Sequence, residues 1–411
     1  MKKLIQIILL AALSFTTYAQ VVTTSVDTIL PTLLKADQTK MSLVELQKLA
    51  EDRNQDLEIA FENYIIAKRR VTVARSDFNP FGTGHVLGLA LGLNYLWVPL
   101  AVEAVLSIPT KIYNISKNSS LAKAEAANYA RAQKKLKNEI AHLYFDIVTH
   151  ETILKTIDIE LGVYAELQKH YESLQNAARV NEVVKTVLAL QIERINIGNL
   201  LIEELAALRT MVLKDINDKK IELSQISSEL NDLFIQNTDL NTLESVALRN
   251  SDEYRMFEHL YDASIKNVKQ VKWSILTFSG MNFAYGKRIK IAKNEREIAR
   301  LEREASELKV KKTAVAKLDT FQSALDVFAN YNSLSDSSVD FYRGVNINYS
   351  NNAAPFDAVA QSAIGAIRDF RNKVVAHYAA WSAFDDLKLA AGVEFKFDST
   401  GERTIQTQME K

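Results

Sequence analysis

Apolar residues recur at alternating steps of three and four over most of the chain, and this spacing predicts long helices that pack side by side. The longest row runs through residues 118–174, where only Gly162 would weaken a helix. Its members are Leu136, Ile140, Leu143, Ile147, His150, Leu154, Ile157, Leu161, Tyr164, Gln168 and Tyr171. A helix of this length extends about 85 Å at 1.5 Å per residue, so its apolar row needs neighbouring helices to cover it.

A reversal and a returning helix are expected after this row. We predict the reversal at residues 176–181 and the returning helix at about 182–234. The returning helix keeps the heptad spacing through Leu201, Leu205, Leu208 and Val212. Together the two segments predict an antiparallel helical hairpin.

Two stretches of the chain share one template. Residues 43–75 (LVELQKLAEDRNQDLEIAFENYIIAKRRVTVAR) align without gaps with residues 240–272 (LNTLESVALRNSDEYRMFEHLYDASIKNVKQVK). The equivalent pairs are Leu46 and Leu243, Ala50 and Ala247, Asp56 and Glu253, Val71 and Val268, and Arg75 and Lys272. Each stretch opens a unit with the same order: a helix, an apolar interruption, a long heptad helix, a turn and a returning helix. The chain is therefore predicted to consist of two tandem structural repeats.

The second repeat follows that order in shorter form. Its expected elements are a small aromatic hairpin at about 273–285, a long charged helix at about 287–343, a reversal at 346–354 and a last helix that Gly392 ends. The predicted divisions of the chain are a signal peptide at 1–19, a leader at 20–40, repeat 1 at 41–238, repeat 2 at 239–392 and a tail at 393–411.

An apolar stretch at about 86–112 interrupts the first repeat. Its large residues share one parity (Leu87, Leu89, Leu91, Leu93, Tyr95 and Trp97), and small or polar residues occupy the other (Gly88, Ala90, Gly92 and Asn94). This alternation predicts a membrane β-hairpin with one face toward lipid, because a tilted membrane strand needs about 9–11 residues. The competing interpretation is a transmembrane helix, since Gly84, Gly88 and Gly92 stand at four-residue spacing, a helix-packing motif.

The N-terminus predicts export. Lys2 and Lys3 precede an apolar run at residues 4–15, and small residues follow before Gln20. This is the pattern of a secretory signal peptide, which we expect to be cleaved after Ala19.

Composition excludes several classes of protein. The chain has no Cys, and 50 Lys and Arg balance 50 Asp and Glu, so there is no disulfide framework, no thiolate metal site and no net charge to attract nucleic acid. No two of the six His stand four residues apart, and neither a P-loop nor a G-x-S-x-G motif occurs. We therefore expect neither an enzyme nor a cofactor. His150 is interpreted as a packed or paired core residue, and the alternating charges of residues 287–312 as a solvated helix face.

These features together resemble the outer-membrane efflux proteins, the TolC-like channels. The two openings carry that family's start pattern, the segments VNEVVKTVLALQ and NNAAPFDAVAQ resemble its helix reversals, and YAAWSAFDDLKLAAG resembles its closing helix. The resemblance covers about residues 41–392. It implies a mainly α fold with long coiled-coil helical hairpins in two tandem repeats and short membrane β-hairpins, assembled as a TolC-like α-barrel and β-barrel. It also implies a homotrimer in outer-membrane lipid with a periplasmic extension, a periplasmic adaptor and an inner-membrane transporter.

The same resemblance supplies candidate site residues. The periplasmic tips that would dock the partners carry Asn181, Glu182 and Val183 in one repeat and Ala354, Pro355 and Phe356 in the other. The candidates for the aperture are Arg179 and Asp357, with a plain solvated turn as the alternative. The candidate membrane-interface aromatics are Tyr95, Trp97, Trp273 and Tyr285, with core packing as the alternative.

The function expected from the resemblance is that of a passive exit duct. It would be the outer-membrane channel of a tripartite efflux or type I secretion system, conducting substrates from an inner-membrane pump across the periplasm and outer membrane. A second hypothesis is a periplasmic coiled-coil structural or adaptor protein without a pore, because the hairpin at 273–285 is short for a bilayer. The chain also departs from the family at the first reversal, where Asn181 stands in place of the usual glycine. A third is an inner-membrane anchor through residues 86–108.

Overall fold

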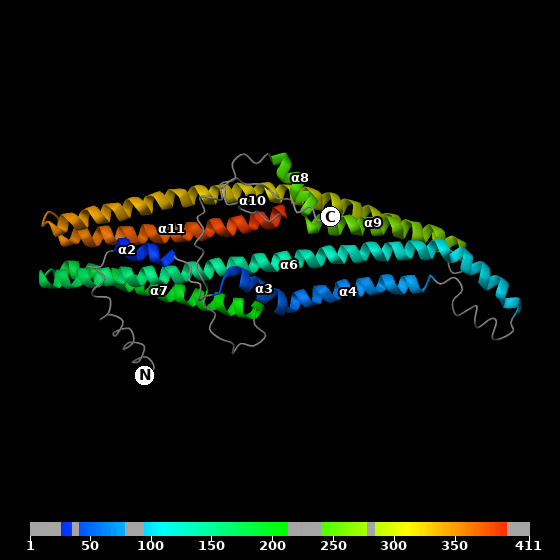
Figure 1. Ribbon diagram of the computed structural model, residues 1–411, viewed down its shortest axis with the longest axis horizontal. Helices are drawn as coiled ribbons and strands as arrows, with labels where there is room; N and C mark the ends of the chain where they lie inside the picture. Colours follow the sequence, from blue (N-terminus) through cyan, green and yellow to red (C-terminus); the bar gives the residue numbers. More distant parts are fainter. Residues whose placement is uncertain are drawn as a thin grey trace, which may run out of the picture. The chain divides into compact units, whose positions relative to one another are not determined.

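The computed structural model describes residues 26–34, 41–78, 94–212, 223, 240–277 and 284–392. Nearly all of these residues are helical (Figure 1), and within these ranges the one bridge between extended segments joins Met41 to Leu223. The chain divides into two compact units. The first unit comprises Met1–Arg53, Lys137–Gln236 and Leu318–Asp386, and the second comprises Asn54–Leu136, Asn237–Lys317 and Leu387–Lys411.

The two similar openings form matching pairs of helices. Helices α3 (Leu43–Arg53) and α8 (Leu240–Asn250) have 11 residues each, and α4 (Gln55–Ser76) and α9 (Asp252–Trp273) have 22 residues each. The breaks fall at Asn54 and Ser251, whose side chains accept hydrogen bonds from the backbone N–H groups three residues on. Because both residues are good N-caps, the same local chemistry starts both second helices. Two short segments, α2 (Val26–Ile29) and η1 (Leu30–Leu34), precede α3.

The predicted helical hairpins are present in both halves of the chain. Helix α6 (Asn94–Ser173, 80 residues) turns back into α7 (Ala177–Val212, 36 residues), and α10 (Tyr285–Ser350, 66 residues) turns back into α11 (Phe356–Ala391, 36 residues). In Figure 1 each returning helix runs beside the helix before it. The first reversal comes earlier than the predicted 176–181, because the Asn176 side chain accepts a hydrogen bond from the backbone N–H of Arg179 and starts α7 at Ala177.

Gly392 ends α11 as predicted. Its φ is 65°, a left-handed conformation, and its N–H donates to the Lys388 carbonyl at 2.9 Å. A Cβ atom at this position would lie 2.8 Å from both the Cβ and the carbonyl oxygen of Asn250. Both the backbone angle and the close approach therefore require glycine here.

Four helices pack in sequence within the second unit. Phe61 of α4 and Tyr129 of α6 place their ring centroids 5.5 Å apart. Lys134 of α6 pairs with Asp252 of α9 at 2.6 Å, and Glu253 of α9 pairs with Lys309 of α10 at 2.9 Å. The order of contacts is therefore α4 to α6, α6 to α9, and α9 to α10.

The core of the first unit lies between its two hairpins. The predicted row on α6 is largely buried, and its fully buried members include Ile140, Ile147 and Ile157. Across the hairpins, the rings of Phe145 on α6 and Tyr378 on α11 stack with centroids 6.2 Å apart. The heptad spacing thus predicted the buried face of this helix correctly.

The expected membrane hairpins differ from the structure where it describes them. The hairpin expected at 86–112 is wrong for residues 94–112, which are the start of α6, and residues 86–93 lie outside the described ranges. The hairpin expected at 273–285 is wrong for its first strand, because Trp273 ends α9 and Ser274–Leu276 form the 3-10 turn η3, while residues 278–283 are not among those described.

The physical reason is that alternation does not by itself fix a strand. A helix satisfies its backbone hydrogen bonds within one segment, whereas a strand needs a neighbouring strand. The alternation also weakens at Leu96 and Val98, so the apolar run fits either period. Among the helices within the described ranges, none has a stretch that is both long and apolar enough to cross a membrane.

Candidate functional site

The two reversals meet at one end of the first unit. The Tyr171 hydroxyl near the end of α6 donates a hydrogen bond to Oδ2 of Asp357, the second residue of α11, at 3.0 Å. His170 Nε2 lies 3.5 Å from the other Asp357 oxygen, and the His170 ring lies 5.0 Å from that of Phe356. These four residues, His170, Tyr171, Phe356 and Asp357, form what we call the tip cluster.

The local sequence explains why the cluster forms. Asp357 lies in the first turn of α11, where the positive end of the helix dipole favours a carboxylate. The Phe356 ring also contacts Tyr349, near the end of α10, with ring centroids 6.0 Å apart. One aromatic ring therefore contacts both α10 and α6 at the reversal. The polar reversal thus places an anion and a ring against α6.

Electrostatics keep the tip hydrogen bond intact. Burial raises the pKa of the Tyr171 hydroxyl, and its hydrogen bond to Asp357 and the charge of that carboxylate raise the pKa further. Tyr171 therefore remains a neutral donor at physiological pH. A hydrogen bond of this charged kind is among the stronger ones in proteins.

The structure separates the predicted tip residues into two groups. In the first repeat, Asn181 and Glu182 are exposed on the first turns of α7, and Val183 faces the core. In the second repeat, Pro355 is exposed, while Ala354 and Phe356 are half-buried. Phe356 thus belongs to the tip cluster, whereas the exposed three offer a surface beside it.

The two aperture candidates also have different partners. Asp357 joins the two reversals through Tyr171. Arg179 pairs with Glu182 on its own helix at 3.0 Å, and both side chains are largely exposed. Exposed pairs of this kind contribute little stability, so between these two candidates it is Asp357 that links the hairpins at the tip.

The four candidate membrane aromatics lie at helix ends. Tyr95 and Trp97 fall in the first turn of α6, although their side chains lie outside the described part. Trp273 is exposed at the end of α9, and the Tyr285 hydroxyl at the start of α10 donates to the Lys272 carbonyl at 3.0 Å. Tyr285 therefore ties the beginning of α10 back to the end of α9.

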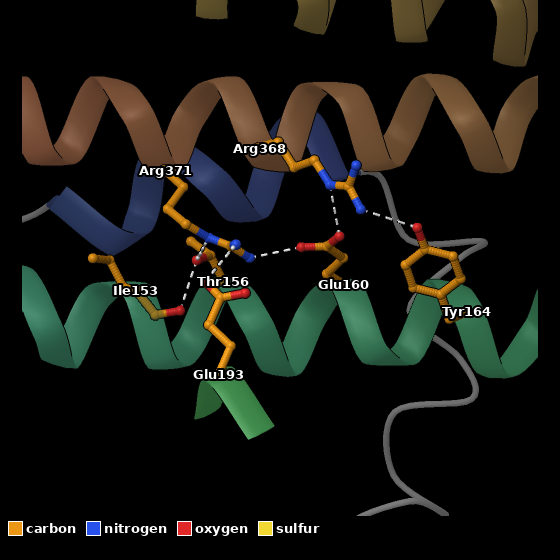
Figure 2. A network of polar contacts seen from close by, with 7 residues as sticks. All are labelled: Ile153, Thr156, Glu160, Tyr164, Glu193, Arg368 and Arg371. Carbon is orange, nitrogen blue, oxygen red and sulfur yellow. Dashed lines mark hydrogen bonds and ion pairs between the residues drawn. The ribbon is translucent and has the colours of Figure 1, made fainter. Parts of the chain in front are cut away.

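Sequence reasoning missed a buried ionic network at the centre of the first unit. Figure 2 shows Glu160 of α6 between Arg368 and Arg371 of α11. The Arg371 Nη2 atom donates to Glu160 at 2.6 Å and the Arg368 Nε atom at 2.9 Å. Arg371 also reaches Thr156 Oγ1 at 3.2 Å and Glu193 of α7 at 3.4 Å, so one guanidinium joins three helices. The available signal was a pair of arginines three residues apart within the polar run at residues 368–373 of α11.

A second polar cluster has residue types found in hydrolases. Ser382 Oγ lies 2.6 Å from His142 Nδ1, and His142 Nε2 lies 2.8 Å from Asp386 Oδ1. The hydrogen bond with Asp386 raises the pKa of His142. The serine and its neighbours are inside α11, where backbone N–H groups are used by the helix and offer no oxyanion site. The cluster therefore works as a cross-link between α6 and α11.

Metal binding finds no support in the described part of the chain. No group of three or more His, Cys, Asp or Glu side chains there could hold an ion. His150, which lies on the predicted apolar row, pairs with Glu204 of α7 at 2.9 Å. That contact fits the interpretation of His150 as a paired core residue.

Comparison with solved structures places this architecture among outer-membrane channels. The outer membrane protein VceC of Vibrio cholerae matches with a TM-score of 0.64 and 10% identity over 85% of this chain and 96% of its own. The CmeC outer membrane channel of Campylobacter jejuni matches with 0.66 and 11% identity over 85% of each chain. The open state of the Neisseria gonorrhoeae MtrE outer membrane channel matches with 0.64 and 13% identity, over 85% of this chain and 88% of its own.

Searches by sequence gave a different result. No protein-family model and no curated protein matched the chain. At identities this low, the structural likeness establishes the fold.

Proposed function

We propose that this chain, which has the fold of the TolC-like outer-membrane channels as the sequence resemblance predicted, is a passive exit duct. It would serve as the outer-membrane component of a tripartite efflux or type I secretion system. The observation that carries the proposal is the likeness to solved channels over 85% of the chain.

Conduction would require no covalent chemistry from this chain. An inner-membrane pump would supply the energy, and the helices would enclose a water-filled path through the periplasm. The polar clusters within the described part are ion pairs and hydrogen bonds between helices, which suit a wall that must hold its shape.

The partners follow from the same proposal. The chain would form a homotrimer with its outer end in lipid, where Trp273 and Tyr285 would lie near the membrane interface. The tips would face a periplasmic adaptor and the inner-membrane transporter. Asn181, Glu182 and Pro355 are exposed there and are the residues we assign to docking.

The tip cluster would control opening. The hydrogen bond between Tyr171 and Asp357 ties α6 to α11 at the reversals, so it would hold the aperture closed. Separation of the hairpins would require this bond to break. A variant without the hydroxyl should therefore open more readily.

Single-channel conductance of purified protein in planar bilayers tests the proposal. We expect rare openings in the wild type and about tenfold more frequent openings in Tyr171→Phe, because a hydrogen bond to a charged group contributes about 1.5 kcal/mol. The matched control is Tyr164→Phe, which removes a hydroxyl from the same helix that binds Arg368 instead of the tip.

Two results would contradict the duct. One is the absence of conductance in all three proteins. The other is release of the native protein by osmotic shock with no change in drug susceptibility of a deletion strain, which would support the periplasmic coiled-coil alternative.

A further inference from the structure

Positive charge gathers where four helix segments of the second unit lie side by side. These segments are residues 68–76 of α4, 106–118 of α6, 263–273 of α9 and 285–294 of α10. They contain thirteen Lys and Arg and no Asp or Glu, although the whole chain balances 50 basic against 50 acidic residues. We call these four segments the basic band.

Contacts between the segments show that they are neighbours in the folded unit. Asn114 Oδ1 of α6 lies 3.5 Å from Gln270 Nε2 of α9. The Tyr285 hydroxyl of α10 donates to the Lys272 carbonyl of α9 at 3.0 Å. Arg70 of α4 lines a depression together with residues of α6. The cations of the four segments therefore belong to one region of the surface.

Most of these cations have no acidic partner. Lys266 pairs with Asp262 at 2.5 Å, and no other Lys or Arg of the band forms an ion pair with a carboxylate of a described residue. Farther along α10 the situation is different, because Arg300 pairs with both Glu297 and Glu304 at 2.6 Å. The absence of ion pairs is therefore particular to the band within the described part of the second unit.

The stability of the chain does not explain the cations at the start of α10. Lys287, Arg288 and Lys290 follow the first residue of this helix, Tyr285, and all three are exposed. The first turn of α10 contains no acidic residue. Because a helix N-terminus carries a partial positive charge, cations there are unfavourable unless an anion lies nearby. Their place therefore indicates an anionic partner outside the chain.

Exposed apolar side chains adjoin the cations. Trp273 directly follows Lys272 at the end of α9 and is 43% exposed, and Ile275 beyond it is 41% exposed. Ile112 follows Lys111 on α6 and is also exposed. A soluble polyanion offers nothing apolar to cover such side chains, whereas a membrane surface presents anionic headgroups above a hydrocarbon layer. The combination of charge and apolar surface therefore favours lipid.

We propose that the basic band binds the headgroups of anionic phospholipids at the membrane surface. Its cations contact lipid phosphates, while Trp273 and the two exposed isoleucines beside the band enter the interface. Lys and Arg suit this role because their apolar stems lie along a protein surface while the charge reaches a phosphate. The proposal rests on the membrane location in the proposed function and adds the class of lipid that is bound there.

Lipid that co-purifies with the full chain tests the proposal. The protein is reconstituted into vesicles with equal amounts of phosphatidylglycerol and phosphatidylethanolamine and is then extracted in a mild detergent. Mass spectrometry quantifies the lipids that remain bound. The band variant combines Lys287→Gln, Arg288→Gln and Lys290→Gln.

A matched control variant combines Arg300→Gln, Lys309→Gln and Lys311→Gln. It removes the same charge from a part of α10 where these cations have carboxylate partners within the chain. The two variants therefore differ in the place of the lost charge and not in its amount.

We expect the wild type and the control variant to retain phosphatidylglycerol in preference to phosphatidylethanolamine. The band variant should lose at least about tenfold of that preference, because each cation near an anionic surface contributes about fivefold to binding. Added salt should reduce the preference of the wild type, since screening weakens such contacts.

Three results would overturn the proposal. The first is an equal preference in all three proteins, and the second is a loss in the control variant as large as that in the band variant. The third is binding to purified peptidoglycan that the band variant loses while its lipid preference is unchanged. That result would assign the cations to the cell wall.

Urea titration in a zwitterionic detergent checks that the band variant folds. We expect its midpoint to equal or exceed that of the wild type, because α10 loses cations from the positive end of its dipole. A lower midpoint would assign these cations to the stability of the chain and overturn the proposal.

Conductance of the same vesicles separates this inference from the proposed function. Conductance without a lipid preference would support the duct and overturn the role of the basic band. A lipid preference without conductance would support the basic band and overturn the duct.

Discussion

Replacing Arg371 by leucine should destabilise the protein strongly. Glu160 is fully buried, and its two guanidinium partners differ in their surroundings. The Arg371 side chain is 14% exposed and bonds at 2.6 Å, whereas Arg368 is 51% exposed and bonds at 2.9 Å. Arg371 is therefore the partner that neutralises Glu160 away from solvent (Figure 2).

The size of the effect follows from this difference. Breaking a buried ion pair by removing one partner costs about 3–5 kcal/mol. Because Arg368 remains on the second carboxylate oxygen, we expect Arg371→Leu to cost about 3 kcal/mol, at the lower end of that range. The matched control Arg368→Leu should cost at most about 1 kcal/mol, since its charge is largely solvated.

A double variant separates pairing from packing. Glu160→Leu combined with Arg371→Leu removes both buried charges, and such replacements are often neutral. The double variant should therefore unfold at a higher urea concentration than Arg371→Leu alone. Urea titration of detergent-solubilised protein, followed by circular dichroism, measures all four proteins. A cost below about 1 kcal/mol for Arg371→Leu, or a double variant less stable than that single variant, would refute the reasoning.

Three further predictions concern stability and use the same titration. Gly392→Ala should cost about 1–3 kcal/mol because of its positive φ and close neighbour, whereas Gly365→Ala, in open space on the same helix, should gain about 0.5–1 kcal/mol. Ser251→Ala should cost about 1 kcal/mol through the lost N-cap of α9, and an unchanged midpoint would contradict that role. The bond to Asp386 raises the pKa of His142, so their ion pair is fully present below the ordinary value of 6.5 and is lost as pH rises through the higher folded-state pKa. Asp386→Asn should accordingly destabilise more at pH 6 than at pH 9, and equal losses would contradict the ion pair.

The long helices were predictable because their evidence is repeated many times. Every apolar residue that follows the last by three or four positions on α6 is further evidence for the helical period. Residues such as Ile147 and Ile157 are buried, as that period predicts. A helix cap, in contrast, depends on a single residue. Because the Asn176 side chain caps α7, the first reversal lies closer to the N-terminus than predicted. The apolar periodicity does not contain that information.

The apolar segment at 94–112 shows the opposite situation. Its alternation and its helical content both fit the same few residues, so the pattern could not decide between a strand and a helix. The choice depends on where the backbone N–H and C=O groups find hydrogen-bond partners, and a helix supplies these partners within its own segment.

The polar contacts were the least predictable part of the site. Asp357 was an aperture candidate from its place in the reversal, but its partner Tyr171 lies 186 residues away. Glu160 and Arg371 are 211 residues apart. A pair of this kind depends on how two hairpins pack, and sequence spacing within either hairpin does not contain that information.

The duplication also explains why a single chain leaves apolar rows open. Each long helix can pack against the short helix of its own repeat and against the short helix of the next repeat, as α6 does with α4 and α9. Among the described helices, α10 packs against α9, and no third helix equivalent to α4 and α9 is present to use its second face. Val71 and its counterpart Val268 are both buried, whereas Ile66 is open and its counterpart Ala263 is covered. The exposed rows are therefore the unpaired ends of one repeated contact.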